Sequence, residues 1–218
     1  ELFSGLPGFA DDGIKAWDVS RVTSMAGMFR GCLHFNGPIG RWDVSSVTDM
    51  AEMFSEAASF NQPIGGWAVS RVESMAGMFE SAIHFDQPLG KWDVSSVTSL
   101  ARVFAGASRF NQPIQNWATG SVATLDAAFE GAAAYNRPLY SWDVSRVLSM
   151  DAVFSGAGRF DQDLSVWDVA RVTSMVGTFE GATSFSGALG RWNVGRVADT
   201  SSLFEGATLF NSPLGGWD

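Results

Sequence analysis

Residues 42–64 read WDVSSVTDMAEMFSEAASFNQPI, and this stretch recurs along the whole chain with a period of 25 residues. Below, one repeat is called a coil, and the positions that share one place in the repeat form a column. Self-similarity at a fixed period of roughly 20–50 residues is the sequence signature of a repeat architecture, so this repeat decides the fold. All nine tryptophans follow the period, as Trp17, Trp42, Trp67, Trp92, Trp117, Trp142, Trp167, Trp192 and Trp217.

Each coil carries signals for one short strand and one short helix. The segment FNQPI at 60–64 predicts a strand. A column that always holds Ser, Thr or Asp predicts the N-cap of a helix such as 25–30, and a glycine such as Gly31 predicts its left-handed C-cap. Elements this short cannot offset their chain entropy alone, so the coils must stack. The N-cap column is Ser24, Asp49, Ser74, Ser99, Thr124, Ser149, Ser174 and Asp199.

The chain is therefore expected to be an α/β solenoid of about eight 25-residue coils. We expect residues 1–218 to form a single repeat domain, with an irregular first coil at 1–16, where one extra residue precedes Ile14. The chain starts at Glu1 without an initiator methionine and stops inside the repeating pattern, so it is also expected to be a fragment of a longer chain.

The unit F-N-Q-P-I-x-x-W-D-V-S-x-V-T-x-M-x-x-M-F-x-x-A closely resembles the BspA-like, DUF285-type repeat, a divergent relative of the leucine-rich repeat. Nearly the whole chain matches it, and the coil at 117–139 departs most, with Thr119, Gly120, Ala123 and Ala128. The resemblance implies a right-handed, leucine-rich-repeat-like stack with strands lining one face. It also implies a place in surface proteins and lipoproteins, with roles in adhesion or protein recognition. It offers no catalytic residues to transfer.

Composition excludes several classes of partner. With 14 basic against 23 acidic residues, the net charge of −9 opposes binding to nucleic acid. The single cysteine, Cys32, excludes an internal disulfide, and no Cys or His cluster has zinc-site spacing, so neither a metal nor a cofactor is expected. No run approaches the roughly 18 apolar residues of a membrane helix, so no direct membrane insertion is expected. The segment shows no signal or anchor, and an extracellular or cell-surface location is expected from the resemblance alone.

Two polar columns have competing interpretations. The aspartates that follow the tryptophans could chelate calcium, although interruptions at Ala68, Ala118 and Asn193 favour backbone hydrogen bonds in a turn. The column that follows the second aromatic column could be an internal hydrogen-bonding ladder, or could line an exposed strand face. The aspartates are Asp18, Asp43, Asp93, Asp143, Asp168 and Asp218; the second column is Asn36, Asn61, Asp86, Asn111, Asn136, Asp161, Ser186 and Asn211.

If the strand face is exposed, the residues beside that second column become candidate partner contacts. Tyr140 and Val166 join them because they are apolar where other coils carry glycine or polar residues. The predicted contact residues are therefore Gln62, Gln87, Gln112, Arg137, Tyr140, Gln162 and Val166.

The sequence bears on three classes of function. An enzyme is disfavoured because polar residues recur as ladders and do not converge on one site. The first expectation is a non-catalytic scaffold that recognises a protein, or secondarily a glycan, at a cell surface. The alternative is a structural subunit that stacks end to end or docks within a larger assembly, because the last coil ends on Leu209, Phe210, Leu214 and Trp217 without a polar cap.

Overall fold

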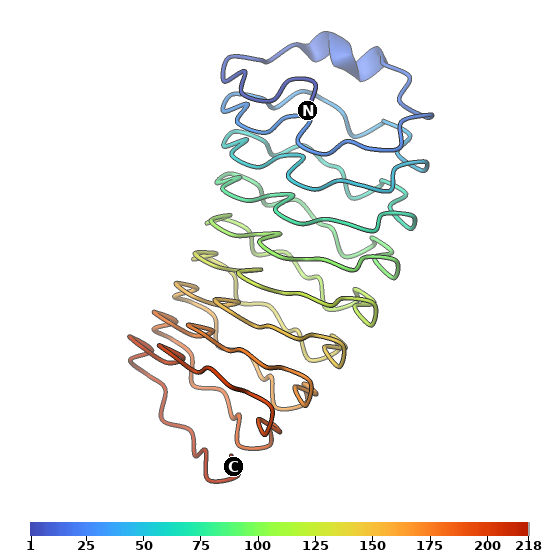
Figure 1. The fold of residues 1–218 in the computed structure, drawn as a ribbon. Coiled ribbons are helices and arrows are strands. Elements are labelled where there is room, and N and C mark those ends of the chain that lie inside the picture. Colours follow the sequence, from blue (N-terminus) through green and yellow to red (C-terminus); the bar gives the residue numbers. More distant parts are fainter. Residues whose placement is uncertain (218) are drawn as a thin grey trace.

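The computed structural model describes residues 1–217 and shows coils stacked one on another from the N-terminal to the C-terminal end (Figure 1). Adjacent coils are joined by backbone hydrogen bonds: the amides of Met25, Gly27 and Phe29 donate to the carbonyls 24 residues later at 2.8–2.9 Å. The same pattern recurs from coil to coil, so each coil is held mainly by its two neighbours along the chain.

The predicted α/β, leucine-rich-repeat-like architecture, with one strand and one helix in every coil, is wrong. Within residues 1–217 the structure has one helix, the five-residue 3₁₀ helix η1 (Asp12–Ala16), and isolated parallel β-bridges in place of a sheet. The bridges fall on the column that was predicted to be the N-cap. They pair Ser24 with Asp49 and continue in steps of 25 residues to Asp199.

Alternating backbone conformation prevents the predicted helix at 25–30. Every member of the column that starts with Gly27, including Glu52 and Arg102, has φ between 54° and 61°. The column that starts with Gly31 is also left-handed throughout, even at Glu56. Since a helix needs consecutive right-handed residues, these columns divide the segment into tight turns, such as the bond from the Met28 amide to the Met25 carbonyl at 3.1 Å. The remaining amides are free to bond to the next coil.

The predicted strand at 60–64 is absent because its backbone lacks the required partners. Pro63 has no amide to donate, which interrupts a ladder. The amide of Asn61 donates to the side-chain oxygen Oδ1 of Asn36 at 2.9 Å and not to a backbone carbonyl. Side-chain bonding thus replaces a β-ladder on this side of the coil.

Aromatic columns fill the interior, as the sequence indicates. Phe54 stacks on Phe60 of its own coil with ring centroids 3.8 Å apart, and on Phe79 of the next coil at 5.7 Å. Trp92 is 3% exposed and its indole Nε1–H donates to the Ile64 carbonyl at 3.2 Å. Each buried indole from Trp42 to Trp192 has such an acceptor 28 residues earlier, which satisfies its polar group.

The first coil differs from the others. Phe3 donates its amide to the Met28 carbonyl at 3.0 Å, as Phe29 does to Met53, so Phe3 takes the place of Phe29 with a spacing of 26. The extra residue lies between Phe9 and Ile14, where η1 begins, and the N-cap residue Asp11 accepts the Gly13 amide at 2.7 Å. No helix among residues 1–217 is long and apolar enough to cross a membrane.

Candidate functional site

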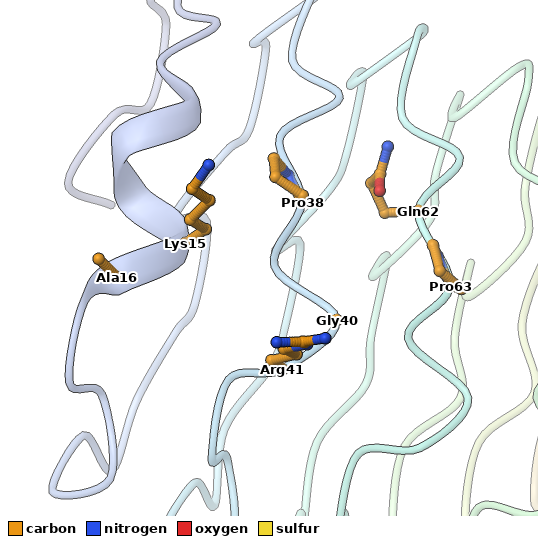
Figure 2. A pocket seen from close by; sticks show the side chains of 7 residues that line it. All are labelled: Lys15, Ala16, Pro38, Gly40, Arg41, Gln62 and Pro63. Atoms are coloured by element: carbon orange, nitrogen blue, oxygen red, sulfur yellow. The ribbon is translucent and has the colours of Figure 1, made fainter.

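A groove runs along one side of the stack, where proline and glycine columns of successive coils lie together. Its largest hollow, about 740 Å³, crosses three coils (Figure 2). A second, of about 310 Å³, shares Pro63 with the first and extends the groove to Lys91. We define the Pro–Gly face as the proline column and the two positions that precede each tryptophan. The first hollow is lined by Lys15, Ala16, Pro38, Gly40, Arg41, Gln62 and Pro63.

Close packing between coils explains the glycines of this face. A Cβ built on Gly90 would lie 2.8 Å from the carbonyl oxygen of Pro113 in the next coil, closer than real Cβ atoms approach. Gly40 and Gly65 would meet the carbonyls of Pro63 and Pro88 more closely still. Only glycine fits such an approach without a shift of the backbone. In these coils the floor of the groove is therefore flat backbone, with proline rings beside it.

The first hollow concentrates unpaired positive charge. Lys15 and Arg41 both line it and both are exposed. Among residues 1–217 the ion pairs are Arg30 with Glu52 and Arg102 with Glu80, so neither cation of the hollow has a carboxylate partner there. In a chain of net charge −9, this is a local excess of positive charge available to an acidic ligand.

Five of the predicted contact residues already bond within the protein. Gln62 donates its side-chain amide to Asn36 Oδ1 at 3.1 Å, and Arg137 donates Nε–H to the Asn111 carbonyl at 2.8 Å. Gln87, Gln112 and Gln162 donate to the preceding coil in the same way. The asparagine column therefore forms the predicted hydrogen-bonding ladder between coils, but the ladder lies at the surface, since members such as Asn36 and Asn136 are exposed. Of the five contact residues, Gln62 also lines the large hollow.

Tyr140 and Val166 are placed differently. Their exposed fractions are 58% and 63%, among the highest for large apolar side chains in residues 1–217. By register they lie on the Pro–Gly face, Tyr140 in the column of Gly40 and Val166 in the column of Arg41. They interrupt the groove with apolar surface in the middle coils.

The sequence interpretation missed Lys15, Arg41 and Lys91. For Arg41 and Lys91 a signal was present, since the position directly before the invariant tryptophan changes from Arg41 through Lys91 to Val166 and Arg191. A variable position next to an invariant one marks surface. Lys15 lies one position further from its tryptophan, in the irregular first coil, and had no such signal.

The aspartate column is structural. Asp93 Oδ1 accepts the Ser95 amide at 3.1 Å and the Ser95 hydroxyl at 2.6 Å. These two bonds, the hydroxyl first, hold the pKa of the Asp93 carboxyl below its ordinary value because they stabilise its charged form. Asp143 Oδ1 accepts the Ser145 amide at 2.9 Å, and Ser145 likewise lowers the pKa of the Asp143 carboxyl. No group of three or more metal-ligating side chains occurs among residues 1–217, and Asp218 lies outside the described residues.

Cys32 does not resemble a nucleophile. It is fully buried, in a column otherwise filled by alanines such as Ala57, and its Sγ lies 3.1 Å from the Phe3 carbonyl. Burial raises the pKa of its thiol, which disfavours the reactive thiolate.

Comparison with known proteins identifies one family. The sequence profile of the family described as "Mycoplasma protein of unknown function, DUF285" matches residues 1–117, 64–157, 84–187 and 138–218. These overlapping matches together cover the whole chain. A search of curated proteins finds no match.

Proposed function

The chain belongs to the DUF285 family, and from this premise we propose that it is a non-catalytic scaffold that recognises a protein partner through its Pro–Gly face at a cell surface. The cell-surface setting rests on the family resemblance, and the recognition surface rests on the geometry of the groove. The site has no resident cofactor in this proposal.

The observation that carries the proposal is the hollow lined by Lys15 and Arg41, whose cations have no carboxylate within ion-pair distance among residues 1–217. It continues into a glycine-floored groove that crosses several coils, which suits an extended segment better than a compact ligand. Exposed cations would steer an acidic segment towards the groove. Tyr140 would then supply an apolar contact of the kind that dominates binding energy at interfaces.

A non-catalytic role agrees with how polar groups are used elsewhere in the stack. The asparagine column and the aspartates that follow the tryptophans are engaged in hydrogen bonds repeated from coil to coil. Catalysis requires a few groups that converge on one reacting atom, whereas these groups are spread along the stack.

The proposal is tested by crosslinking at single positions. A photoreactive residue at position 140 or 166 should capture the same acidic protein from a surface fraction, and a matched probe at Leu148 should not. Leu148 is a suitable control because it is 46% exposed and apolar but lies outside the Pro–Gly face. The captured partner should bind at least about tenfold more weakly to the Tyr140→Ser and Arg41→Ala variants. Equal capture at position 148, or a glycan as the ligand, would contradict the proposal.

The alternative expected from the sequence is a structural subunit docked within a larger assembly. Recovery of the chain in one fixed, stoichiometric complex from source extract would support this alternative. Recovery free, or with substoichiometric partners, would support recognition.

A further inference from the structure

Asn36 and Gly37 form an Asn-Gly pair that occurs once in the sequence, in the second coil of the stack. The other asparagines are followed by residues with side chains, such as Gln62 after Asn61. Glycine leaves its own main-chain nitrogen open to the side-chain amide before it, because no Cβ stands in the way. Packing explains the glycine, since a Cβ on Gly37 would lie 2.8 Å from Cε2 of the Phe35 ring.

The side-chain amide of Asn36 is bonded in a way that prepares its carbon for nucleophilic attack. Its Oδ1 accepts the main-chain amide of Asn61 at 2.9 Å and the side-chain Nε2 of Gln62 at 3.1 Å. Two donors on one carbonyl oxygen stabilise the negative charge that the oxygen gains when a nucleophile adds to the carbon. Asn36 is exposed, and its Nδ2 donates no hydrogen bond within residues 1–217, so nothing in this part of the chain retains the leaving nitrogen.

The nearest nucleophile is the main-chain nitrogen of Gly37, which the fold does not use. It donates no hydrogen bond within residues 1–217, whereas the amides of Phe35 and Ile39 donate to carbonyls at 3.0 and 2.9 Å. Its addition to Cγ of Asn36 therefore breaks no hydrogen bond of the described coils. Attack within one chain also has the high effective concentration of an intramolecular reaction.

We propose that Asn36 is a site of spontaneous deamidation that changes the charge beside the hollow of the Pro–Gly face. The Gly37 nitrogen bonds to Cγ of Asn36, its proton passes to Nδ2 through solvent, and Nδ2 leaves as ammonia. Water then opens the cyclic imide, which gives aspartate if water adds at Cγ and isoaspartate if it adds at the main-chain carbonyl. The net reaction consumes water and releases ammonia, with no oxidation or reduction.

The fold already accepts aspartate in the column of Asn36. Asp86 Oδ1 accepts the Asn111 amide at 3.0 Å, and Asp161 Oδ1 bonds to the coil after it in the same way. The aspartate product can therefore keep the ladder between coils. It adds a negative charge, because an aspartate carboxyl is ionised at neutral pH.

The new charge lies beside the hollow. Gln62, which bonds to Asn36, lines it, and so does Pro38 (Figure 2). A carboxylate there offsets part of the positive charge of Lys15 and Arg41, so it weakens the attraction of an acidic ligand. This effect on binding rests on the function proposed above, whereas the reaction at Asn36 does not.

Peptide mapping by mass spectrometry tests the reaction. During incubation of the folded chain at neutral pH, Asn36 should convert at least about tenfold faster than Asn61. Asn61 is the matched control within the chain, since its Oδ1 also has two donors, the Asp86 amide and the Gln87 side chain, both at 3.0 Å. A peptide of residues 31–41 is the positive control. No conversion of Asn36 under conditions that convert the peptide, or equal conversion of Asn61, would overturn the proposal.

A variant tests the part that the ladder plays. Gln62→Leu removes one of the two donors to Asn36 Oδ1 and should slow the conversion of Asn36 in the folded chain. An equal or faster rate would overturn the activation by these donors. Tryptophan fluorescence should confirm that the variant is folded.

The charge effect is measured with a fluorescent oligoglutamate peptide as the probe. Asn36→Asp should weaken binding of the probe by about two- to fivefold at low salt, and added salt should reduce the difference. Asn36→Ser is the neutral control, because Ser186 occupies the same column. Asn136→Asp places the same charge further along that column, away from the hollow, and should leave binding unchanged.

The outcomes separate this inference from the proposed function. Equal weakening by Asn36→Asp and Asn136→Asp, or none by either, would overturn the link between Asn36 and the hollow. If the unmodified chain does not bind the probe, the charge effect and the acidic partner both fail, while the mass measurement still decides whether Asn36 deamidates.

Discussion

Tyr135 is the single residue whose chemistry fits its position worst. It stands in the column otherwise filled by phenylalanine, is fully buried, and its hydroxyl has no hydrogen-bond partner among residues 1–217. Burial raises the pKa of that hydroxyl far above its ordinary value, so it stays neutral. Its ring still stacks on Phe110 at 5.9 Å, so packing is retained while a polar atom is buried unpaired.

Tyr135→Phe should therefore stabilise the protein. Removing an unsatisfied buried hydroxyl is worth about 1–3 kcal/mol. Urea unfolding followed by tryptophan fluorescence would measure the free energy of unfolding. The reverse change in the same column, Phe110→Tyr, is the control and should destabilise. A lower stability of Tyr135→Phe would mean that the hydroxyl does have a partner.

Ala152 shows a second kind of mismatch, in the backbone. Its φ is 54°, in the left-handed region that costs a non-glycine residue about 1–2 kcal/mol. Glycine avoids this cost but loses more entropy on folding, by about 0.4–1 kcal/mol. Ala152→Gly should thus raise the free energy of unfolding by about 0.5–1 kcal/mol. Gly177→Ala, in the same column with φ of 58°, should lower it, and equal effects of the two changes would refute the argument.

Among the elements of the fold, the tryptophan column combines ring stacking between coils with satisfied indole N–H groups. Trp92 is held between Trp67 and Trp117, with ring centroids 6.5 and 6.3 Å away, and its N–H is satisfied. Trp92→Ala should cost about 3–5 kcal/mol because the stack cannot collapse onto the cavity. Trp17→Ala is the matched control: Trp17 is 42% exposed at the end of the column and should cost less. A loss below about 1 kcal/mol for Trp92→Ala would be incompatible with its burial.

The turns after the tryptophans make stability depend on pH. The folded pKa values of Asp93 and Asp143 are lowered by their serine hydrogen bonds. Their stabilisation is therefore complete above the unfolded pKa, about 3.9, and is lost as pH falls through the folded pKa. The urea midpoint should accordingly fall on acidification below about pH 4.

The variant Asp93→Asn/Asp143→Asn should show a smaller decrease over the same pH range. Asparagine keeps the turn, since Asn193 Oδ1 accepts the Gly195 amide at 3.3 Å in this column, but it does not titrate. An equal decrease in both proteins would assign acid sensitivity to other carboxylates.

At the scale of the whole molecule, the stack is a chain of nearest-neighbour contacts, so its ends should be weaker than its middle. Hydrogen–deuterium exchange should show fast exchange at Phe204 and Gly206, whose amides are unpaired in an isolated chain, and slow exchange at Phe104 and Gly106, which bond to the next coil. Equal exchange rates at these four positions would contradict this account.

The sequence by itself determined the period, the aromatic interior and the side-chain ladders. Each depends on chemistry that repeats every 25 residues, and a repeated residue type has to meet its own copy in the next coil. It also indicated the left-handed glycine position at Gly31, because glycine adopts that conformation most easily. Tyr140 and Val166 could be identified as exposed because they break their columns.

Only the tertiary structure decided what the backbone does between those columns. Ser24 and most of its equivalents accept an amide two residues later in a tight turn, as Asp49 does at 3.0 Å, and a helix N-cap makes a similar local bond. A helix forms if the following amides bond within their own coil, and tight turns form if they bond to the next coil. Stacking makes the carbonyls of the next coil available to these amides in every coil. The Pro–Gly groove likewise arises between coils, from the approach of a proline carbonyl to a glycine 23 residues earlier. The glycine and the proline carbonyl that approaches it belong to adjoining coils, so the groove exists only once the coils are stacked.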